Sequence, residues 1–497
     1  MSKLLKDTVT KWNKWFWIIL SLAILIRLVI LTEIPHALYH NDSASYTNQT
    51  HSLLTDGRGI LNRRPLGYPL ILASVISVAG DYLAVVIVQM LTGLAVAVIL
   101  YHLFWKVYPN RTAALWLFGT LSLTTLGIVA EMSVLAELFF MSFVSLAFWM
   151  AMRICQKPGI LYFLPFGLFA GFASLIKVVA IYYLPVGLLL ALFLRGPAWR
   201  LKHIVLSMAV FSLSTLAFPL GQSLYNHSVN QYFGTNLHGG MQLFAISAHL
   251  LNLDSEPHYS IKQKLKPYMR NDKLGNIHYQ INWLLFVKDG PRDMMMREAG
   301  SMIVYDKLCR DLAFDAIGSD PLTFLYRGAK VFVLHIFAAN STYNHFHKDY
   351  DTIHRKSHKY MNYHDDRFPV LYDIRKHNST LHKPLDSPQK ESFVKPYSSA
   401  GSAVRFLLTL SPLRINTIWT LSFILSFYLL FIRLRLLPKR YIPIYLIVLF
   451  HVGAHSLISV PNARYLYPVL PVMMFFSIMA TFRWREARNE KSNENFA

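Results

Sequence analysis

The sequence predicts an all-α polytopic membrane protein, and three observations support this fold class. Of the 497 residues, 54% are apolar and only 15% are charged, whereas about 25% of the residues in a soluble domain are charged. Apolar runs of about 20 residues, the length that crosses a bilayer, recur along the chain. Lysines and arginines lie in the connections between these runs, so membrane topology explains the formal charge of +22 better than nucleic-acid binding does.

Residues 1–220 are predicted to form an N-terminal transmembrane module of seven spans. The first apolar run is too long for a signal-peptide core and no cleavage site follows it, so we expect a retained helix. The predicted spans are 15–31, 83–105, 113–129, 133–152, 161–175, 178–194 and 204–220. Basic residues occupy alternate connections, namely Lys106 and Arg111, then Arg153 and Lys157, then Arg195, Arg200 and Lys202. The positive-inside rule therefore places these connections and the N-terminus in the cytoplasm.

The chain then becomes polar, and residues 221–402 are predicted to face largely outward. Spans resume at 415–431, 442–458 and 465–480, within a C-terminal transmembrane region of residues 403–483, and residues 484–497 are expected to be a cytoplasmic tail. Parity leaves the apolar run 322–339 as a re-entrant or interfacial helix. The count is ten crossings, eleven if the His-rich stretch after residue 339 is cytoplasmic, or twelve if 403–410 joins another hairpin.

This topology separates the two cysteines and suggests a location. Cys155 and Cys309 are expected on opposite sides of the membrane, so they cannot pair within one folded chain. We expect a bacterial inner membrane protein with both termini in the cytoplasm.

Carboxylates at the outer ends of the spans are the first candidates for chemistry. Asp42 follows the first span in a polar turn, where it could accept a proton from a hydroxyl. The alternative is a helix N-cap, a position that aspartate also favours. Glu131 and Glu137 lie at the outer start of the fourth span, where an ionisable residue is costly and is by default a functional candidate. A buried carboxyl that fixes helix packing is their alternative.

Basic residues are predicted on the same side of the membrane. Arg63 and Arg64 open a proline-stiffened loop, where a guanidinium could hold the paired oxygens of a phosphate or contact ordinary anionic headgroups. Lys177 lies at an outer turn, where a lysine that only snorkels is common. Arg464 begins the last span. Together the outer carboxylates and cations predict one charged site at this face.

Two polar residues lie within the spans themselves. Arg27 is near the outer end of the first span and could pair with an intramembrane carboxylate, although the sequence does not choose the partner. His455, near the outer end of the penultimate span, is either a packing residue or part of the site.

The order of these features resembles the GT-C glycosyltransferases, specifically the branch of protein mannosyltransferases and aminoarabinose transferases. The resemblance covers most of the chain. It is carried by Asp42, Arg64-Pro65, Gly67-Tyr-Pro69, Val134-Leu-Ala-Glu137-Leu-Phe-Phe140, Gly171-Phe-Ala-Ser-Leu-Ile-Lys177, Asn226, Tyr232-Phe-Gly234 and Asn462-Ala-Arg-Tyr-Leu-Tyr-Pro468. The chain departs from the family in having Arg-Arg-Pro-Leu where Lys-Pro-Pro is common, and a glutamate for an aspartate at the fourth span.

The resemblance implies a GT-C-like bundle of about 10–12 transmembrane helices with an outward-facing loop region. It also implies an inverting transferase that moves a hexose or pentose from a polyprenyl-phosphate donor to a lipid, glycan or protein acceptor on the outer face. The implied catalytic residues are Asp42, Glu137 and Glu131. The implied donor-binding residues are Arg64, Arg63, Lys177, Arg464 and Tyr68. Support is expected from Arg27, Tyr46, His455 and Asn226.

A metal is the remaining question, because the stretch 344–382 is rich in histidine and aspartate, which coordinate transition metals. Its spacings match no closed site, and a solvated, pH-sensitive loop is the preferred interpretation. Members of this branch with lipid monophosphate donors resemble metal-independent enzymes. We therefore expect no obligatory metal or cofactor, with a divalent cation as the alternative.

Two rival functions stay open. A flippase or transporter for a lipid-linked anion would need similar charges, but we see neither the internal repeats nor the interrupted helices that are typical of transporters. A non-catalytic assembly subunit would tolerate loss of Asp42 and Glu137. The expected partners are the donor, the acceptor and membrane lipids, with no nucleic acid, and the sequence names neither sugar nor acceptor.

Overall fold

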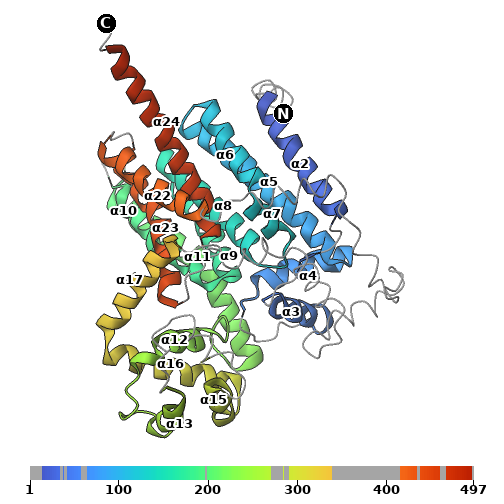
Figure 1. Ribbon diagram of the computed structural model, residues 1–497, viewed down its shortest axis with the longest axis vertical. Helices are drawn as coiled ribbons and strands as arrows, with labels where there is room; N and C mark the ends of the chain where they lie inside the picture. Colours follow the sequence, from blue (N-terminus) through green and yellow to red (C-terminus); the bar gives the residue numbers. More distant parts are fainter. Residues whose placement is uncertain are drawn as a thin grey trace.

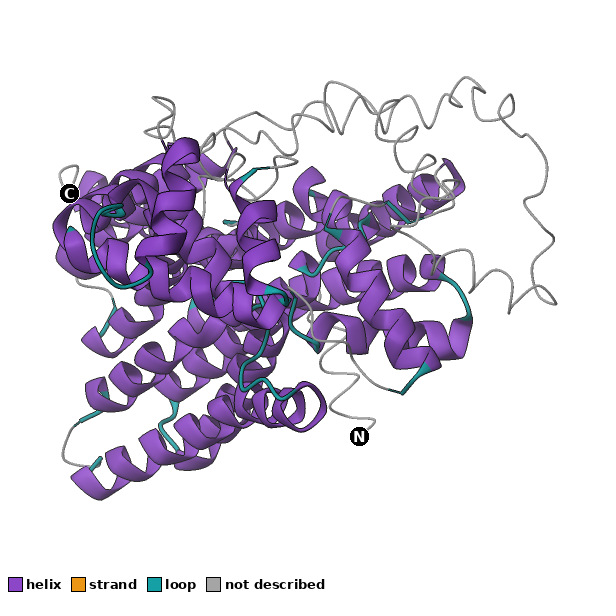
Figure 2. Cartoon of the chain, turned by 90° about the horizontal axis from the view of Figure 1, so that it is seen from below, coloured by secondary structure: helices purple, strands orange, loops and turns teal. Residues whose placement is uncertain are grey.

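The computed structural model describes residues 14–494, apart from 34–36, 39–41, 58–63, 196–198, 270–283, 285–289, 338–414, 434–436 and 459–465. These residues are almost entirely helical, and Figure 2 shows helices joined by short loops with no strand in the described part of the chain. An isolated parallel bridge pairs Leu38 with Ser133. The predicted all-α class is confirmed.

The described part of the N-terminal module contains ten α-helices. They are α2 (Lys14–Glu33), α3 (Ser43–Thr55), α4 (Gly67–Ala79), α5 (Tyr82–Val107), α6 (Arg111–Leu123), α7 (Thr125–Met132), α8 (Glu137–Gln156), α9 (Ile160–Ile176), α10 (Tyr183–Phe193) and α11 (Leu201–Asn230), with the short 3-10 helix η1 (Val178–Tyr182) before α10. Five helices of the described chain are long and apolar enough to cross a membrane: 14–32, 82–107, 137–156, 201–230 and 439–457. Four shorter apolar helices cover 67–79, 160–176, 178–193 and 418–433.

The module differs from the prediction in three places. Helices α3 and α4 were not predicted, because neither is long enough to span; α4 has 13 residues and reaches only about 20 Å. The predicted span 113–129 is broken at Thr124, whose extended backbone separates α6 from α7. Helix α11 continues to Asn230, ten residues past the expected boundary at 220. The connection between α2 and α5, which is the first predicted outer connection, therefore contains the two helices α3 and α4.

Small residues let the central helices approach closely. Helix α9 packs between α8 and α11. A side chain on Gly171 would lie 2.6 Å from the Thr215 carbonyl oxygen, and one on Gly167 would lie 2.8 Å from the Phe211 carbonyl oxygen. Glycines four residues apart on one helix face give this kind of close backbone contact in membranes. This packing fixes the end of α9, where Lys177 follows.

The polar middle of the chain forms a small helical subdomain with its own core. It comprises α12 (Gly239–Ser247), η2 (Ala248–Leu250), α13 (Tyr259–Met269), α15 (Pro291–Ala299) and α16 (Met302–Ser319). Phe244, Tyr305 and Leu312 are among its buried residues, and this core is separate from the main one. In Figure 1 the subdomain lies at the bottom, beyond the bundle. We call it the outer subdomain, because it lies beyond the bundle in this view.

Helix α17 (Pro321–Phe337) leaves the outer subdomain and packs against the C-terminal helices α22 (Ile415–Phe427) and α23 (Ile442–Ile458). A side chain on Gly328 of α17 would lie 2.7 Å from Leu457 of α23, so the two helices are in close contact. The exposed residues of α17 include Leu322, Leu325 and Tyr326. An apolar exposed face is the property expected of the predicted interfacial or re-entrant helix.

The remaining C-terminal elements are the π-helix η5 (Tyr428–Arg433) and the 3-10 helices η6 (Lys439–Tyr441) and η8 (Tyr467–Val469), followed by α24 (Leu470–Glu494). The last helix was expected to end near residue 480 and to be followed by a tail, but it continues through the charged segment to Glu494. The Tyr108 hydroxyl donates to Glu486 over 2.5 Å, which ties this extension to the end of α5. The start of α2 and the end of α24 lie at the top of Figure 1, opposite the outer subdomain.

Candidate active site

A short backbone contact brings the segment before α3 to the junction between α7 and α8. The Leu38 amide donates to the Met132 carbonyl, and the Val134 amide donates to the Leu38 carbonyl, each over 2.9 Å. The Ser43 hydroxyl donates to the Val134 carbonyl, also over 2.9 Å. These bonds hold the chain on both sides of Asp42 against the junction that carries Glu131 and Glu137.

Asp42 forms an ion pair with Arg64. Their nearest atoms, Oδ1 of Asp42 and Nη2 of Arg64, are 2.7 Å apart, and each side chain is about a quarter exposed, at 26% and 25%. Asp42 occupies the N-cap position of α3, but its side chain makes no capping hydrogen bond. Asp42 therefore lacks the hydrogen bond that the capping alternative requires, and the ion pair brings two predicted site residues together.

Two tyrosine rings support the side chain of Arg64. Its guanidinium carbon lies 5.6 Å from the ring centre of Tyr46, a cation–π contact. The Tyr46 ring meets Tyr68 edge-on, with centroids 5.0 Å apart. The side-chain amide of Gln49 also donates to the Arg64 carbonyl over 3.0 Å. Tyr68, which is predicted to bind the donor, is fully buried, and its donor-binding role stays a prediction.

Gly67 allows the Arg64 loop to approach α9. A side chain at this position would lie 2.6 Å from the carbonyl oxygen of Leu175 and 2.8 Å from the amide nitrogen of Ile176. No side chain fits against backbone at these distances. The absence of one at Gly67 therefore sets the loop on the end of α9, directly before Lys177.

Glu137 and Lys177 form a second pair. Their Oε1 and Nζ atoms are 2.9 Å apart; Glu137 is buried, and 14% of the Lys177 side chain is exposed. Lys177 Nζ also lies 5.6 Å from the ring centre of Phe140, one turn after Glu137 on α8. Its ammonium is therefore anchored by an acid and an aromatic face. This pair places the second predicted acid beside a predicted donor-binding cation.

Arg27 and Glu131 form a third pair, buried within the bundle. Nε and Nη2 of Arg27 donate to the two carboxylate oxygens of Glu131 over 2.8 and 2.7 Å. The remaining Nη1 donates to the carbonyls of Ala23 and Ser122, both over 3.0 Å. The undetermined partner of Arg27 is thus Glu131. Because both carboxylate oxygens face Arg27, we interpret Glu131 as a packing acid, the alternative considered for it above.

The two weaker candidates take different positions. His455 lies on α23 beside His451, with ring centroids 4.8 Å apart, and His451 meets the ring of Tyr182 at 5.3 Å. Phe140 is 6.0 Å from His451, so this group borders the Glu137–Lys177 pair. Asn226 lies elsewhere: its amide donates to the Gly234 carbonyl over 2.5 Å and fastens the turn after α11.

Three sequence predictions lie outside the described residues. They concern Arg63, Arg464 and the His-rich stretch 344–382. Within the described part of the chain, no group of three or more His, Cys, Asp or Glu side chains could hold a metal ion. The described cysteines, Cys155 and Cys309, are free and buried.

Sequence reasoning missed Gln89. This residue lies in the apolar helix α5, and its side chain is fully buried. Its amide donates to the Glu131 carbonyl over 2.6 Å and to the Ser133 carbonyl over 3.0 Å. Its oxygen accepts from the Tyr68 hydroxyl over 3.1 Å. The signal was present, since an uncharged polar residue inside a span also needs hydrogen-bond partners.

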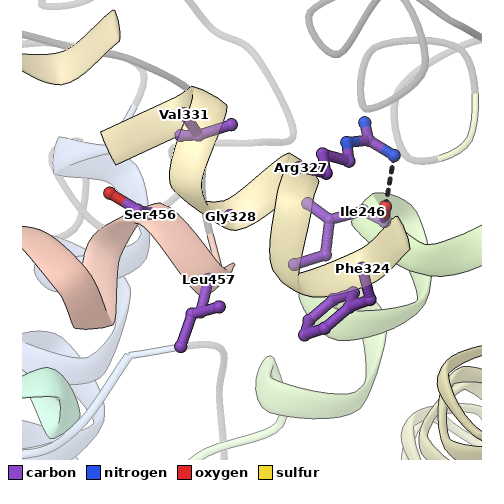
Figure 3. Close-up of a pocket in the computed structure, with 7 residues that line it drawn as sticks. All are labelled: Ile246, Phe324, Arg327, Gly328, Val331, Ser456 and Leu457. Carbon is purple, nitrogen blue, oxygen red and sulfur yellow. Dashed lines mark hydrogen bonds between the residues drawn. The ribbon is translucent and has the colours of Figure 1, made fainter. Parts of the chain in front are cut away.

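A small crevice lies apart from these pairs, between the outer subdomain, α17 and α23 (Figure 3). Its lining residues are Ile246, Phe324, Arg327, Gly328, Val331, Ser456 and Leu457. Arg327 donates to the Ile246 carbonyl, drawn as a dashed line in Figure 3, and to Nδ1 of His249. The lining contains no carboxylate and none of the predicted site residues, so it is not the candidate active site.

The arrangement offers two chemical capabilities at one end of the bundle. Asp42 is a partly exposed carboxylate, which can accept a proton from a bound hydroxyl. Arg64 presents a planar fork that matches the paired oxygens of a phosphate. Lys177 adds a second cation, because the Arg64 loop lies against the end of α9 directly before Lys177. Acid–base and anion-binding groups therefore occur together, as group transfer from a phosphate ester requires.

Comparison with known proteins supports the resemblance inferred from these residues. The sequence profile of the dolichyl-phosphate-mannose-protein mannosyltransferase family matches residues 63–220, less than half of the chain. This segment contains Arg64, Glu131, Glu137 and Lys177. No curated protein sequence matches. The resemblance to the protein mannosyltransferase branch of the GT-C glycosyltransferases is thereby supported over residues 63–220, a range that does not include Asp42.

Solved structures give more distant likenesses. The apo oligosaccharyltransferase of Archaeoglobus fulgidus is 11% identical, with a TM-score of 0.44, over 97% of this chain and 52% of that one. The chain thus spans about half the length of that structure. ArnT from Cupriavidus metallidurans, bound to undecaprenyl phosphate, is 14% identical, with a TM-score of 0.36, over 93% of this chain and 77% of that one.

Proposed function

We propose that this protein is an integral membrane glycosyltransferase that moves a sugar from a polyprenyl-phosphate donor to an acceptor hydroxyl at the outer face of the membrane. The observation that carries the proposal is the Asp42–Arg64 pair, a partly exposed carboxylate 2.7 Å from a guanidinium. The family profile supports it, because the match begins at residue 63 and includes Arg64. The proposal places both termini in the cytoplasm of a bacterial inner membrane.

In the proposed reaction, the acceptor oxygen attacks the anomeric carbon of the donor as the bond from that carbon to the phosphate oxygen breaks. Asp42 takes the hydroxyl proton, and the electron pair of the broken bond leaves with the phosphate. Arg64 stabilises the charge that grows on that phosphate. A single displacement of this kind inverts the anomeric carbon.

The ion pair gives the two roles a natural order. The Arg64 fork contacts the Asp42 carboxylate over 2.7 Å. The donor phosphate is a diester with one negative charge, and it becomes a dianion as its bond to the sugar breaks; arginine binds such a group through two parallel hydrogen bonds. The growing charge on the leaving phosphate would therefore draw Arg64 from Asp42 as the carboxylate takes the hydroxyl proton. We propose Lys177, Arg63 and Arg464 as further cations for the donor and Glu137 as an acid that orients a hydroxyl.

We propose that no metal is obligatory, because a lipid monophosphate leaving group needs only the positive charge that Arg64 and Lys177 supply. Addition of a chelator to the purified protein is expected to leave transfer unchanged. A loss of transfer that Mg²⁺ or Mn²⁺ restores would assign the divalent cation that is the alternative.

The decisive experiment measures transfer of radiolabelled sugar from polyprenyl-phosphate mannose, glucose and arabinose donors to membrane extract. Purified wild type is compared with Asp42→Asn and Arg64→Ala. Asp56→Asn is the matched control, since Asp56 is the C-cap residue at the opposite end of α3. Loss of a general base lowers such rates by about 10²- to 10⁴-fold. We expect that loss in Asp42→Asn, a comparable one in Arg64→Ala and wild-type transfer in Asp56→Asn.

The rival functions give different results in the same preparation. Movement of labelled lipid across liposomes with no donor consumed would replace the transferase with a flippase. Complementation of a deletion strain by Asp42→Asn, with no transfer by any purified variant, would indicate a non-catalytic subunit.

A further inference from the structure

The junction between α7 and α8 poses a hydrogen-bonding problem inside the bundle. The carbonyls at the end of a helix have no partner within it, and no water replaces that partner in an apolar interior. Four successive carbonyls of the junction, those of Glu131, Met132, Ser133 and Val134, accept hydrogen bonds from other parts of the chain. Two of the four bonds come from one side chain, the amide of Gln89.

The same amide also reaches the two tyrosine rings that support Arg64. Its oxygen accepts from the Tyr68 hydroxyl over 3.1 Å while its nitrogen holds the Glu131 and Ser133 carbonyls. Gln89 is fully buried, so these three bonds use its donors and acceptor without help from solvent. Tyr68 meets Tyr46, and Tyr46 carries the guanidinium of Arg64.

We infer that Gln89 is a positioning residue for the transfer reaction, and this inference rests on the proposed function. One branch runs from Gln89 through the junction carbonyls to Leu38 and Ser43, which flank Asp42. The other runs through Tyr68 and Tyr46 to Arg64. A single buried amide thus sets the proposed base and the proposed phosphate clamp relative to each other.

The chemistry of the position explains why glutamine is needed. Two carbonyls require two N–H donors, and a phenol hydroxyl requires an acceptor at the other end of the same planar group. Leucine has a similar size and offers neither. Glutamate offers only acceptors and would face two carbonyl oxygens. Asparagine is one methylene shorter and cannot keep all three partners.

The test compares Gln89→Leu with Gln222→Leu. Gln222 is a buried glutamine of α11 whose amide donates to the Thr235 carbonyl over 2.6 Å, the same distance as from Gln89 to Glu131. Both variants lose a short amide–carbonyl bond, so both report the cost of such a loss. Displacement of a reacting group by about 1 Å lowers rates up to about 100-fold. We expect Gln89→Leu to lose about 10- to 100-fold in kcat/KM for the donor consumed by wild type, and Gln222→Leu to stay near wild type.

Tyr68→Phe separates positioning from folding. This change removes one hydroxyl and keeps the ring against Tyr46, so only the branch to Arg64 is broken. The donor KM should rise several-fold and kcat should fall, because the proposed role of Arg64 includes both the bound donor and the transition state. A partly unfolded sample would lower kcat alone and leave KM unchanged. The double variant with Gln89→Leu should be no worse than Gln89→Leu alone, since the hydroxyl has already lost its partner. Equal kinetics in Gln89→Leu and Gln222→Leu, or independent effects of the two changes, would overturn the inference.

Hydrogen exchange keeps this inference separate from the proposed function. If wild type consumes no donor, the transferase proposal fails, and the network is judged by amide exchange in residues 42–46, 64–68 and 131–137. Faster exchange in all three segments of Gln89→Leu, with none in Gln222→Leu, supports the positioning role. Unchanged exchange in 42–46 and 64–68 contradicts it.

Discussion

The pairs Arg27–Glu131 and Asp42–Arg64 contain the same two chemical groups in opposite environments. Side-chain exposure is 5% and 3% in the first pair, against 25% for Arg64 and 26% for Asp42. In the first pair three nitrogens of Arg27 bond to the carboxylate and to two carbonyls. The second pair is partly exposed, so solvent and ligands have access to it, and we call it the rim pair.

The difference teaches which ion pair a substrate can use. An arginine that is surrounded by its own carboxylate and carbonyls cannot turn to a phosphate without leaving a buried charge behind. A quarter-exposed pair is held by a modest net energy, because water competes for both groups. The buried pair is therefore suited to hold helices together, and the rim pair is suited to open for a ligand.

The largest expected effect comes from breaking the buried pair on one side. Arg27→Met leaves the Glu131 carboxylate without its guanidinium inside the bundle, and removal of one partner of a buried pair costs about 3–5 kcal/mol. We expect loss of the monodisperse protein peak in detergent, or a large fall in the unfolding temperature. Asp42→Asn, measured alongside, should unfold near wild type.

The double variant Arg27→Met with Glu131→Leu is the control for this prediction. Apolar replacement of both partners is often neutral or stabilising, so it should unfold at or above the wild-type temperature and keep its transfer activity. A folded double variant without transfer would instead return Glu131 to the catalytic group.

A smaller effect is expected at Glu137 and Lys177, which lie between the two extremes. Lys177→Met leaves the Glu137 carboxylate without its ammonium, but the site of Lys177 is 14% exposed, so water can enter and the cost should lie below the roughly 3–5 kcal/mol of a fully buried pair. The unfolding temperature should fall by less than in Arg27→Met. Glu137→Gln should cost less than Lys177→Met, since the 14% exposed ammonium can extend to solvent. The reverse order would contradict this ranking by burial.

Much of this could be predicted from the sequence. Apolar runs located α2, α5, α8 and α11, and alternating basic connections placed Asp42, Arg64, Glu137 and Lys177 at one end of the bundle. Helices α3 and α4 were missed because only runs long enough to span were sought. The break at Thr124 has no proline or glycine at or directly beside it, since the nearest glycine is Gly127.

The pairing of the charges could not be predicted, because it depends on how distant helices pack. Arg64 meets Asp42 because Gly67 sets its loop on the end of α9, and Glu137 meets Lys177 because α8 and α9 are neighbours. No local pattern records either contact. Gln89 was not predicted for a simpler reason, because only ionisable residues were considered as candidates inside the spans.

Gly67 offers a test of the rim pair through backbone support alone. Gly67→Ala adds a methyl group 2.6 Å from the Leu175 carbonyl, so the Arg64 loop must move away from α9. Overpacking of this kind costs about 1 kcal/mol or more. We expect a modest fall in the unfolding temperature. We also expect donor affinity to fall by more than this small loss of stability explains, because Arg64 is displaced. Gly221→Ala is the control, since a side chain there meets nothing within 4 Å.

The smallest expected effect concerns Arg327, whose partner is the neutral ring of His249 rather than a carboxylate. Arg327 donates to Nδ1 of His249 in the outer subdomain, so that nitrogen carries no proton. Burial, with the nearby Arg327 charge, lowers the pKa of His249 from 6.5 to about 4, and the Asp320 charge opposes the shift. A depressed pKa means that the folded state favours the neutral ring.

His249 therefore gives a pH dependence whose sign is fixed. Its contribution to stability is fully present above pH 6.5, the unfolded value, and is lost as the pH falls through the folded value of about 4. Because the ring is partly exposed and screened, the loss should be about 1 kcal/mol. His249→Gln keeps an acceptor for Arg327 that does not titrate. The unfolding temperature of wild type relative to His249→Gln should hence fall between pH 6.5 and 4, while a constant difference would show that Arg327 keeps its contact with a protonated ring.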